Sequence, residues 1–214
     1  MTLKNFENCG YAVGKSRYDF IQWHKLNLNV RADLLPVIEG ARHGALVAIY
    51  EEGNSDEKSQ RELLEYCLKR FNLFYKKQGE ALYYICDNEA MLEKLWRRPS
   101  YIGEFLGYPK CCIKAFYKGA RRVSKSQKYY GAPGVVFCRK LFKVYKRMGC
   151  EHPLFYTLHV PCGINCKETL ALGAKIQKAL NDHDKEAAKY LRGHTMKCMY
   201  EFHFYHPPKK SRKK

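Results

Sequence analysis

Apolar positions in the first half of the chain predict a small α/β core over residues 40–90. An uninterrupted apolar run over 44–50 begins at a glycine, as expected of a buried strand. Helical spacing follows Ser55, a residue type that caps helices, and the apolar positions of this helix are Leu63, Leu64, Cys67, Phe71 and Phe74. A second apolar run over 81–86 predicts another buried strand. A strand, a helix and a strand in this order are typical of a crossover unit.

Shorter patterns flank this core. Residues 20–24 and 26–30 show partial alternation of apolar and polar positions, which favours short strands. After the second core strand, we expect Asp87 to cap a helix that continues to Arg98, where Pro99 ends it.

The second half of the chain is predicted to be mainly helical. Pro109 suits the first turn of one helix, and Pro133 with Gly134 opens another. A third helix is expected over 167–192, and alternation over 196–205 predicts a final strand. The cysteine motifs of the chain lie between these predicted helices.

Together these patterns predict the α/β fold class, with α+β as the alternative. We expect one globular domain over 1–206, in which an α/β part (1–98) precedes a mainly helical part (99–206). Residues 207–214 begin with two prolines and consist largely of cations, so this basic tail is predicted to be disordered.

Composition favours a soluble protein of a reducing compartment. The 214 residues are 46% hydrophobic, and none of the apolar runs approaches the ~20 residues that cross a bilayer. The N-terminal residues do not resemble a secretory signal, so we expect a cytoplasmic protein without membrane contact. Ten cysteines in such a compartment indicate metal ligation or redox chemistry more than disulfides. The abundance of lysine, tyrosine and isoleucine is compatible with a thermophilic archaeal source.

The charge of the chain points to an anionic partner. The formal net charge is +18 and the sequence pI is about 9.5. Tyrosine and phenylalanine are interspersed among the cations, a mixture that suits phosphates and unpaired bases, so RNA is the expected partner. The predicted contact residues are Arg121, Arg122, Lys125, Lys128, Arg139, Lys140, Lys143, Lys146 and Arg147. In the alternative interpretation, these cations only solvate helix faces.

Two short cysteine motifs carry the candidate chemistry. Cys111 and Cys112 follow Gly-Tyr-Pro-Lys, and His159 precedes Cys162 and Cys166 in His-Val-Pro-Cys-Gly-Ile-Asn-Cys. Both motifs are predicted to precede helices, whose N-terminal amides and partial positive charge stabilise thiolates. We expect the four thiolates to bind one metal centre, with His159 as a further ligand or as a hydrogen-bond donor to it.

The spacing favours an iron–sulfur cluster over zinc. Cys162 and Cys166 have a spacing found in zinc sites, but adjacent Cys111 and Cys112 fit a single tetrahedral ion poorly. Adjacent thiolates can instead bind different irons of a [4Fe–4S] cluster. The leading hypothesis is therefore a [4Fe–4S] protein that binds RNA or, as an enzyme, modifies it. A non-catalytic RNA-binding protein stabilised by zinc is one alternative, and a thiol redox protein is another.

The two motifs also carry a resemblance. Phe-Leu-Gly-Tyr-Pro before the cysteine pair and the later H-x-P-C-x3-C pattern resemble a family of uncharacterised prokaryotic proteins that is frequent in archaea. The resemblance covers about residues 101–175 and implies a site at Cys111, Cys112, His159, Cys162 and Cys166. Gly163 departs from the family pattern, in which a small polar residue such as serine is expected.

Overall fold

A three-stranded antiparallel sheet is the centre of the first half. Strands β1 (Gly44–Ala48) and β2 (Phe74–Gln78) both pair with β3 (Leu82–Cys86), which lies between them. The computed structural model describes residues 17–18, 21–49, 56–124, 143–144, 147, 149, 151–157, 159 and 161–205, with the side chains of 119–124 and 198–205 left out. The sheet and the many helices confirm the expected α/β class.

The expected crossover unit connects a different pair of strands. The two predicted strands, β1 and β3, are antiparallel neighbours, so they do not form the parallel pair of such a unit. Helix α3 (Glu57–Arg70) instead leads from β1 to β2, and these two strands are parallel because each is antiparallel to β3. The prediction missed β2 because Phe74 continued the helical spacing. The helix actually stops at Arg70, and Asn72 turns the chain with a φ of 54°.

Helix caps lie one residue from their predicted positions. Asp56 caps α3 by accepting hydrogen bonds from the amides of Lys58 and Ser59, whereas the predicted cap Ser55 lies outside the described residues. Asn88, not Asp87, caps α4 (Glu89–Arg97) by accepting from the Ala90 amide at 2.9 Å. Both shifts keep a short polar side chain at the helix start, which is what capping requires.

The strands predicted at 20–24 and 26–30 are wrong, because both segments are helical. Helices α1 (Ile21–Lys25) and α2 (Leu28–Ile38) meet at a turn whose backbone is satisfied by Gln60 of α3. Its side-chain amide accepts from the Asn27 amide and donates to the Lys25 carbonyl, both at 2.9 Å. This partner is distant in sequence, so the local alternation could not predict the turn.

The second half is helical where it is described. Short helices η2 (Pro99–Tyr101) and α5 (Ile102–Phe105) lead to α6 (Lys110–Ser124), and η3 (Pro153–Tyr156) precedes α8 (Lys167–His183) and α9 (Lys185–Tyr205). The single helix predicted over 167–192 is therefore two helices, and the strand predicted over 196–205 is wrong because α9 continues there. The helix predicted at Pro133 and the tail 207–214 lie outside the described residues.

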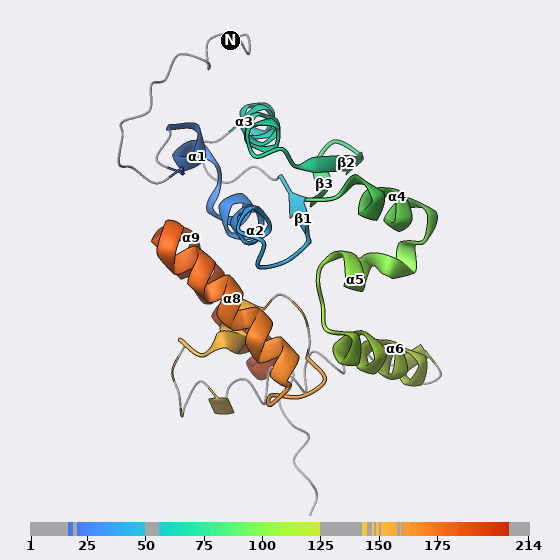
Figure 1. Ribbon diagram of the computed structural model, residues 1–214. Helices are drawn as coiled ribbons and strands as arrows, with labels where there is room; N and C mark the ends of the chain where they lie inside the picture. The colour runs from blue at the N-terminus through green and yellow to red at the C-terminus, as the bar shows by residue number, and fades with distance from the viewer. Residues whose placement is uncertain are drawn as a thin grey trace, which may run out of the picture.

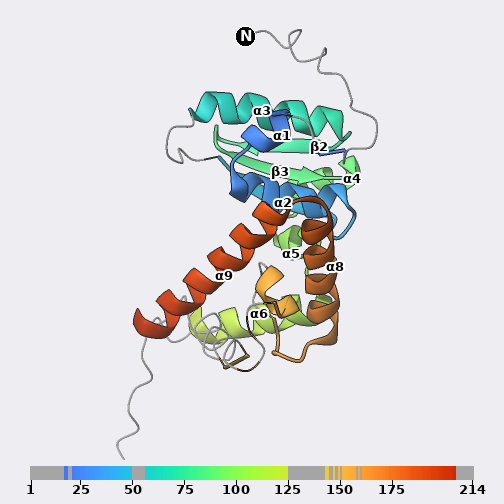
Figure 2. The same cartoon turned by 90° about the vertical axis from the view of Figure 1, so that its left-hand side faces the viewer.

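Two apolar clusters cover the two faces of the sheet. The larger cluster packs Val47 and Tyr83 of one face against α2, α3, η3, α8 and α9. The smaller cluster joins Cys86, at the end of β3, to α4 and α5 through Leu95 and Phe105. Figures 1 and 2 show α3 and α6 at opposite ends of the molecule, with α8 and α9 extending from the sheet region toward α6. Among the described helices, none has the length and apolarity needed to cross a membrane.

Candidate metal centre

A tight turn positions Cys111 and Cys112 at the start of α6. Gly107 adopts a φ of 75°, a backbone conformation that favours glycine because other residues rarely adopt it. Pro109 follows, and its carbonyl accepts from the amides of Cys112 and Ile113 at 2.9 and 3.0 Å. Both thiols therefore lie in the first turn of α6, as the sequence predicted.

The second motif forms the loop that leads into α8. The amide of Cys166 donates to the Gly163 carbonyl at 3.2 Å, which closes the loop between Cys162 and Cys166. Cys166 is the N-cap residue of α8, so its thiol also lies at a helix N-terminus. The predicted placement of this motif at a helix start is confirmed.

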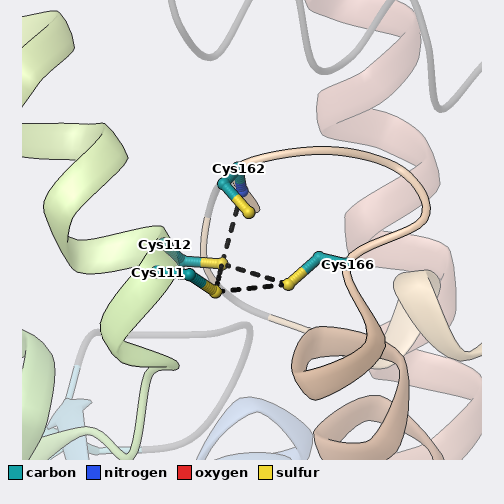
Figure 3. A group of neighbouring side chains, drawn as sticks. All are labelled: Cys111, Cys112, Cys162 and Cys166. Carbon is teal, nitrogen blue, oxygen red and sulfur yellow. Dashed lines mark hydrogen bonds between the residues drawn. The ribbon is translucent and has the colours of Figure 1, made fainter.

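The four sulfur atoms converge, although the two motifs are about fifty residues apart (Figure 3). The Sγ of Cys111 lies 3.8 Å from that of Cys112 and 3.5 Å from that of Cys166, and Cys112 and Cys166 are 3.7 Å apart. With Cys162, all four sulfurs lie within 4.8 Å of one another. This group can hold a metal ion, which is the coarse form of the sequence-based hypothesis.

Three of the four sulfur atoms have different hydrogen-bond partners. The Cys162 amide donates to the Cys112 sulfur at 3.3 Å. Burial opposes ionisation of Cys166, but hydrogen bonds from the hydroxyl and amide of Thr169, together with those from the thiols of Cys111 and Cys162, lower the pKa of this thiol. The carboxylate of Glu168 accepts from Cys111 at 2.9 Å and raises the pKa of that thiol.

His159 lies beside the thiol group and is not one of its four members. Its Nε2 is 3.1 Å from the hydroxyl of Thr169, which in turn is 3.2 Å from the Cys112 sulfur. The imidazole stacks on Tyr108 with ring centroids 4.6 Å apart. Burial lowers the pKa of His159 to about 4, so the ring is neutral at pH 7. Its Nδ1 is buried without a hydrogen-bond partner among the described residues.

Glu168 and Thr169 are the site residues that the sequence analysis missed. Both lie in the first turn of α8, two and three residues after Cys166. Side chains in the first turn after an N-cap cysteine lie close to its sulfur, so their position in the sequence was the available signal. Cys67 and Cys86 are free, buried thiols that do not belong to this group.

Most of the predicted RNA-contact residues cannot be placed. Lys143 and Arg147 are exposed, and Arg121 and Arg122 belong to α6 with undescribed side chains. The others, Lys125, Lys128, Arg139, Lys140 and Lys146, lie outside the described residues.

Helix α6 contributes few of its described side chains to the apolar core. Of its side chains described, from Lys110 to Lys118, only that of Cys112 is buried. Ile113 is half-buried and approaches α5 at Gly103, where a Cβ would lie 3.0 Å from the Ile113 Cγ1. The cysteine group is thus the main described connection between α6 and the loop before α8.

The family of the chain follows from the same region. A family model described as a protein of unknown function (DUF483) matches residues 85–191, half of the chain. The chain belongs to this family. The DUF483 region begins at the end of β3 and extends into α9, so it contains all four cysteines of the group. Membership in an uncharacterised family is what the motif resemblance implied. Neither a curated protein nor a solved structure shows significant similarity to the chain.

Proposed function

We propose that the four cysteines bind one Zn²⁺ ion and that this ion stabilises an RNA-binding protein. The distances between sulfur atoms carry the zinc assignment. Zinc–thiolate bonds of ~2.3 Å in a tetrahedron separate the sulfurs by ~3.8 Å. The three Sγ–Sγ separations among Cys111, Cys112 and Cys166 are 3.5–3.8 Å, which fits this geometry.

A [4Fe–4S] cluster is the competing assignment. Its four thiolates bind four different irons around a cubane, so they must lie further apart than around a single ion. All four sulfurs here lie within 4.8 Å of one another, which favours the single ion. The adjacent pair also causes no difficulty, because its sulfurs are 3.8 Å apart. Four thiolates would complete a closed structural site and leave no position for a substrate.

The charge distribution supports RNA as the partner. A net charge of +18 on 214 residues exceeds what solubility requires, and phosphates are the common polyanions that such a surface would bind. A zinc-stabilised, non-catalytic RNA-binding protein combines both features. RNA modification by an iron–sulfur enzyme would instead require an open iron.

Metal analysis of anaerobically purified protein tests the zinc assignment. We expect about one zinc per chain and a colourless solution. Cys112→Ser should lose most of the zinc, because one of four thiolates is removed. Cys67→Ser is the matched control, since this buried thiol lies outside the group, and it should retain the zinc. Four irons per chain with broad absorbance near ~400 nm, lost in Cys112→Ser, would establish the cluster instead.

The salt dependence of binding tests the RNA assignment. We expect a single-stranded RNA to bind the full-length protein with an affinity that falls steeply as salt rises, because each phosphate contact releases a counterion. Titration of the same RNA at several salt concentrations measures the slope. Absence of binding at low salt, or an affinity independent of salt, would remove RNA from the proposal.

A further inference from the structure

Two adjoining pockets lie along the segment that connects the sheet to α6. The first, of about 430 Å³, is lined by Tyr84, Trp96 and Pro99 among others. The second, of about 290 Å³, is lined by Tyr108, Phe116 and other residues. Ile102 of α5 lines both, so the two pockets are neighbours. Figure 1 shows α4, α5 and α6 following one another along one side of the molecule.

Each pocket exposes large aromatic side chains. Trp96 is 46% exposed in the first pocket, and Phe116 and Tyr117 are 54% and 39% exposed in the second. Tyr84 holds Trp96 from the side, with ring centroids 5.6 Å apart in an edge-to-face arrangement. Lys76 lies over the Trp96 ring with its Nζ 5.3 Å from the ring centroid, so a positive charge already accompanies this ring. Aromatic rings exposed at a pocket offer surface on which flat groups can stack.

The same segment is strongly basic. Residues 94–118 contain six exposed cations and one exposed carboxylate, Glu104. The cations are Lys94, Arg97, Arg98, Lys110, Lys114 and Lys118. A ligand that lay along this segment and filled both pockets would therefore also meet several positive charges, which favours an anionic ligand.

The second pocket also contains a polar group without a partner. His159 lines it, and its Nδ1 is buried with no hydrogen-bond partner among the described residues. The side chain as a whole is only 9% exposed. A buried nitrogen in this state is costly, and a ligand that hydrogen-bonded to it would remove the cost.

We infer that a single-stranded RNA binds along residues 94–118, with one base stacked in the Trp96 pocket and a nearby base in the Phe116 pocket. Flat bases suit the exposed rings, and phosphates suit the six cations. Bases of a duplex are stacked and paired, so they cannot enter such pockets. This inference rests on the proposed RNA binding and names its surface.

Alanine variants of the two rings test the inference. The probe is a labelled oligouridine of about 12 nucleotides, bound to the full-length zinc-containing protein and followed by fluorescence anisotropy. We expect Trp96→Ala and Phe116→Ala each to weaken binding at least about fivefold, whereas Trp96→Phe and Phe116→Tyr retain most of the affinity. Tyr75→Ala is the matched control, because this ring is 37% exposed on β2 outside both pockets, and it should leave binding unchanged.

Two further measurements keep the inference testable if a variant fails to fold. Ultraviolet cross-linking of the wild-type complex should modify peptides within 94–118, and a duplex of equal length should bind more weakly than the single strand. Wild-type affinity in both alanine variants, cross-links confined to other segments, or equal binding of the duplex would overturn the inference alone. Absence of any RNA binding by the wild-type protein would overturn the proposed function as well.

Discussion

Asp184 connects three helices through a single buried carboxylate. One of its oxygens accepts from the Trp23 indole at 2.9 Å and lies 3.0 Å from the Arg31 guanidinium. The other oxygen accepts from the Ala187 amide at 2.9 Å and thereby caps α9. The side chains of Arg31 and Asp184 are each 4% exposed, so neither charge is solvated by water. The charge pair therefore fixes where α8 ends and α9 begins.

Removal of this carboxylate should be strongly destabilising. We expect Asp184→Ala to lower the free energy of unfolding by about 3 kcal/mol or more, because it leaves a buried guanidinium with reduced compensation and removes a cap. Asp182→Ala is the matched control on the same helix, since Asp182 pairs with Lys178 at the surface, and it should cost less than about 1 kcal/mol. Urea denaturation measures both. Equal losses in the two variants would contradict the assigned role of Asp184.

Among single residues, the four cysteines of the candidate site were predictable and their neighbours were not. The spacing and residue types of the two motifs indicated Cys111, Cys112, Cys162 and Cys166 from the sequence. The Thr169 hydroxyl and the Glu168 carboxylate became visible as partners only with the structure, because threonine and glutamate are common at helix starts for other reasons. The Thr169 hydroxyl lies between His159 and the Cys112 sulfur, and the His159 ring stacks on Tyr108. This placement likewise depends on tertiary packing.

At the scale of elements, Gly173 allows η3 to lie directly on α8. A Cβ at this position would lie 2.2 Å from the Pro153 carbonyl oxygen. This backbone oxygen cannot move without displacing η3, whose side chains Leu154, Phe155 and Tyr156 are fully buried. The close approach of the two helices thus requires glycine in the middle of α8 despite its poor helix propensity.

Alanine at two helical glycines should give opposite effects. We expect Gly173→Ala to destabilise the protein by about 1–3 kcal/mol, because the overpacking outweighs the gain in helix propensity. Gly193→Ala should instead stabilise it by up to about 1 kcal/mol, since a Cβ there would meet nothing within 4 Å. Thermal melts of the two variants compare them directly. A stabilised Gly173→Ala variant would show that η3 can move at little cost.

Local patterns predicted some elements and misjudged others for identifiable reasons. Helices α3, α4 and α6 were found because caps and prolines bound regular apolar spacing. Strand β2 was missed because its burial is poor on both sides, as an edge strand beside β3 allows. The segments 20–30 and 196–205 were predicted as strands because short alternation does not exclude a helix. Partners distant in sequence, such as Gln60 at the α1–α2 turn, decided the first of these.

For the whole molecule, the proposed zinc holds one end to the rest. Helix α6 buries only Cys112 among its described side chains, whereas the sheet region has its own apolar cluster. The first turn of α6 and the loop before α8 both supply cysteines to the proposed zinc. Removal of the metal would therefore break this connection between them. The Phe116 pocket includes Cys112 and His159, so its shape depends on the same connection.

Removal of zinc should therefore have a local effect. After chelation, we expect faster amide hydrogen exchange in 110–118 and 161–166, because structural zinc contributes directly to local stability. Exchange in β1, β3 and α3 should change little, since these elements pack in the larger cluster. Hydrogen-exchange mass spectrometry measures both regions, and Cys112→Ser should reproduce the effect without chelator. Uniform acceleration over the whole chain, or no change at 110–118, would contradict this role.

The sequence alone determined which residue types meet at the candidate site and the strongly positive net charge of the chain. Thiols beside glycine and proline at helix starts, and an excess of cations, are local or summed properties, and these do not depend on the fold. Tertiary structure decided the remaining features, because each depends on distances between segments far apart in the chain. The four sulfur atoms lie within 4.8 Å of one another, β3 inserts between two parallel strands, and Ile102 joins two aromatic pockets. Such distances follow from the packing of the whole chain, and a local sequence pattern carries no information about them.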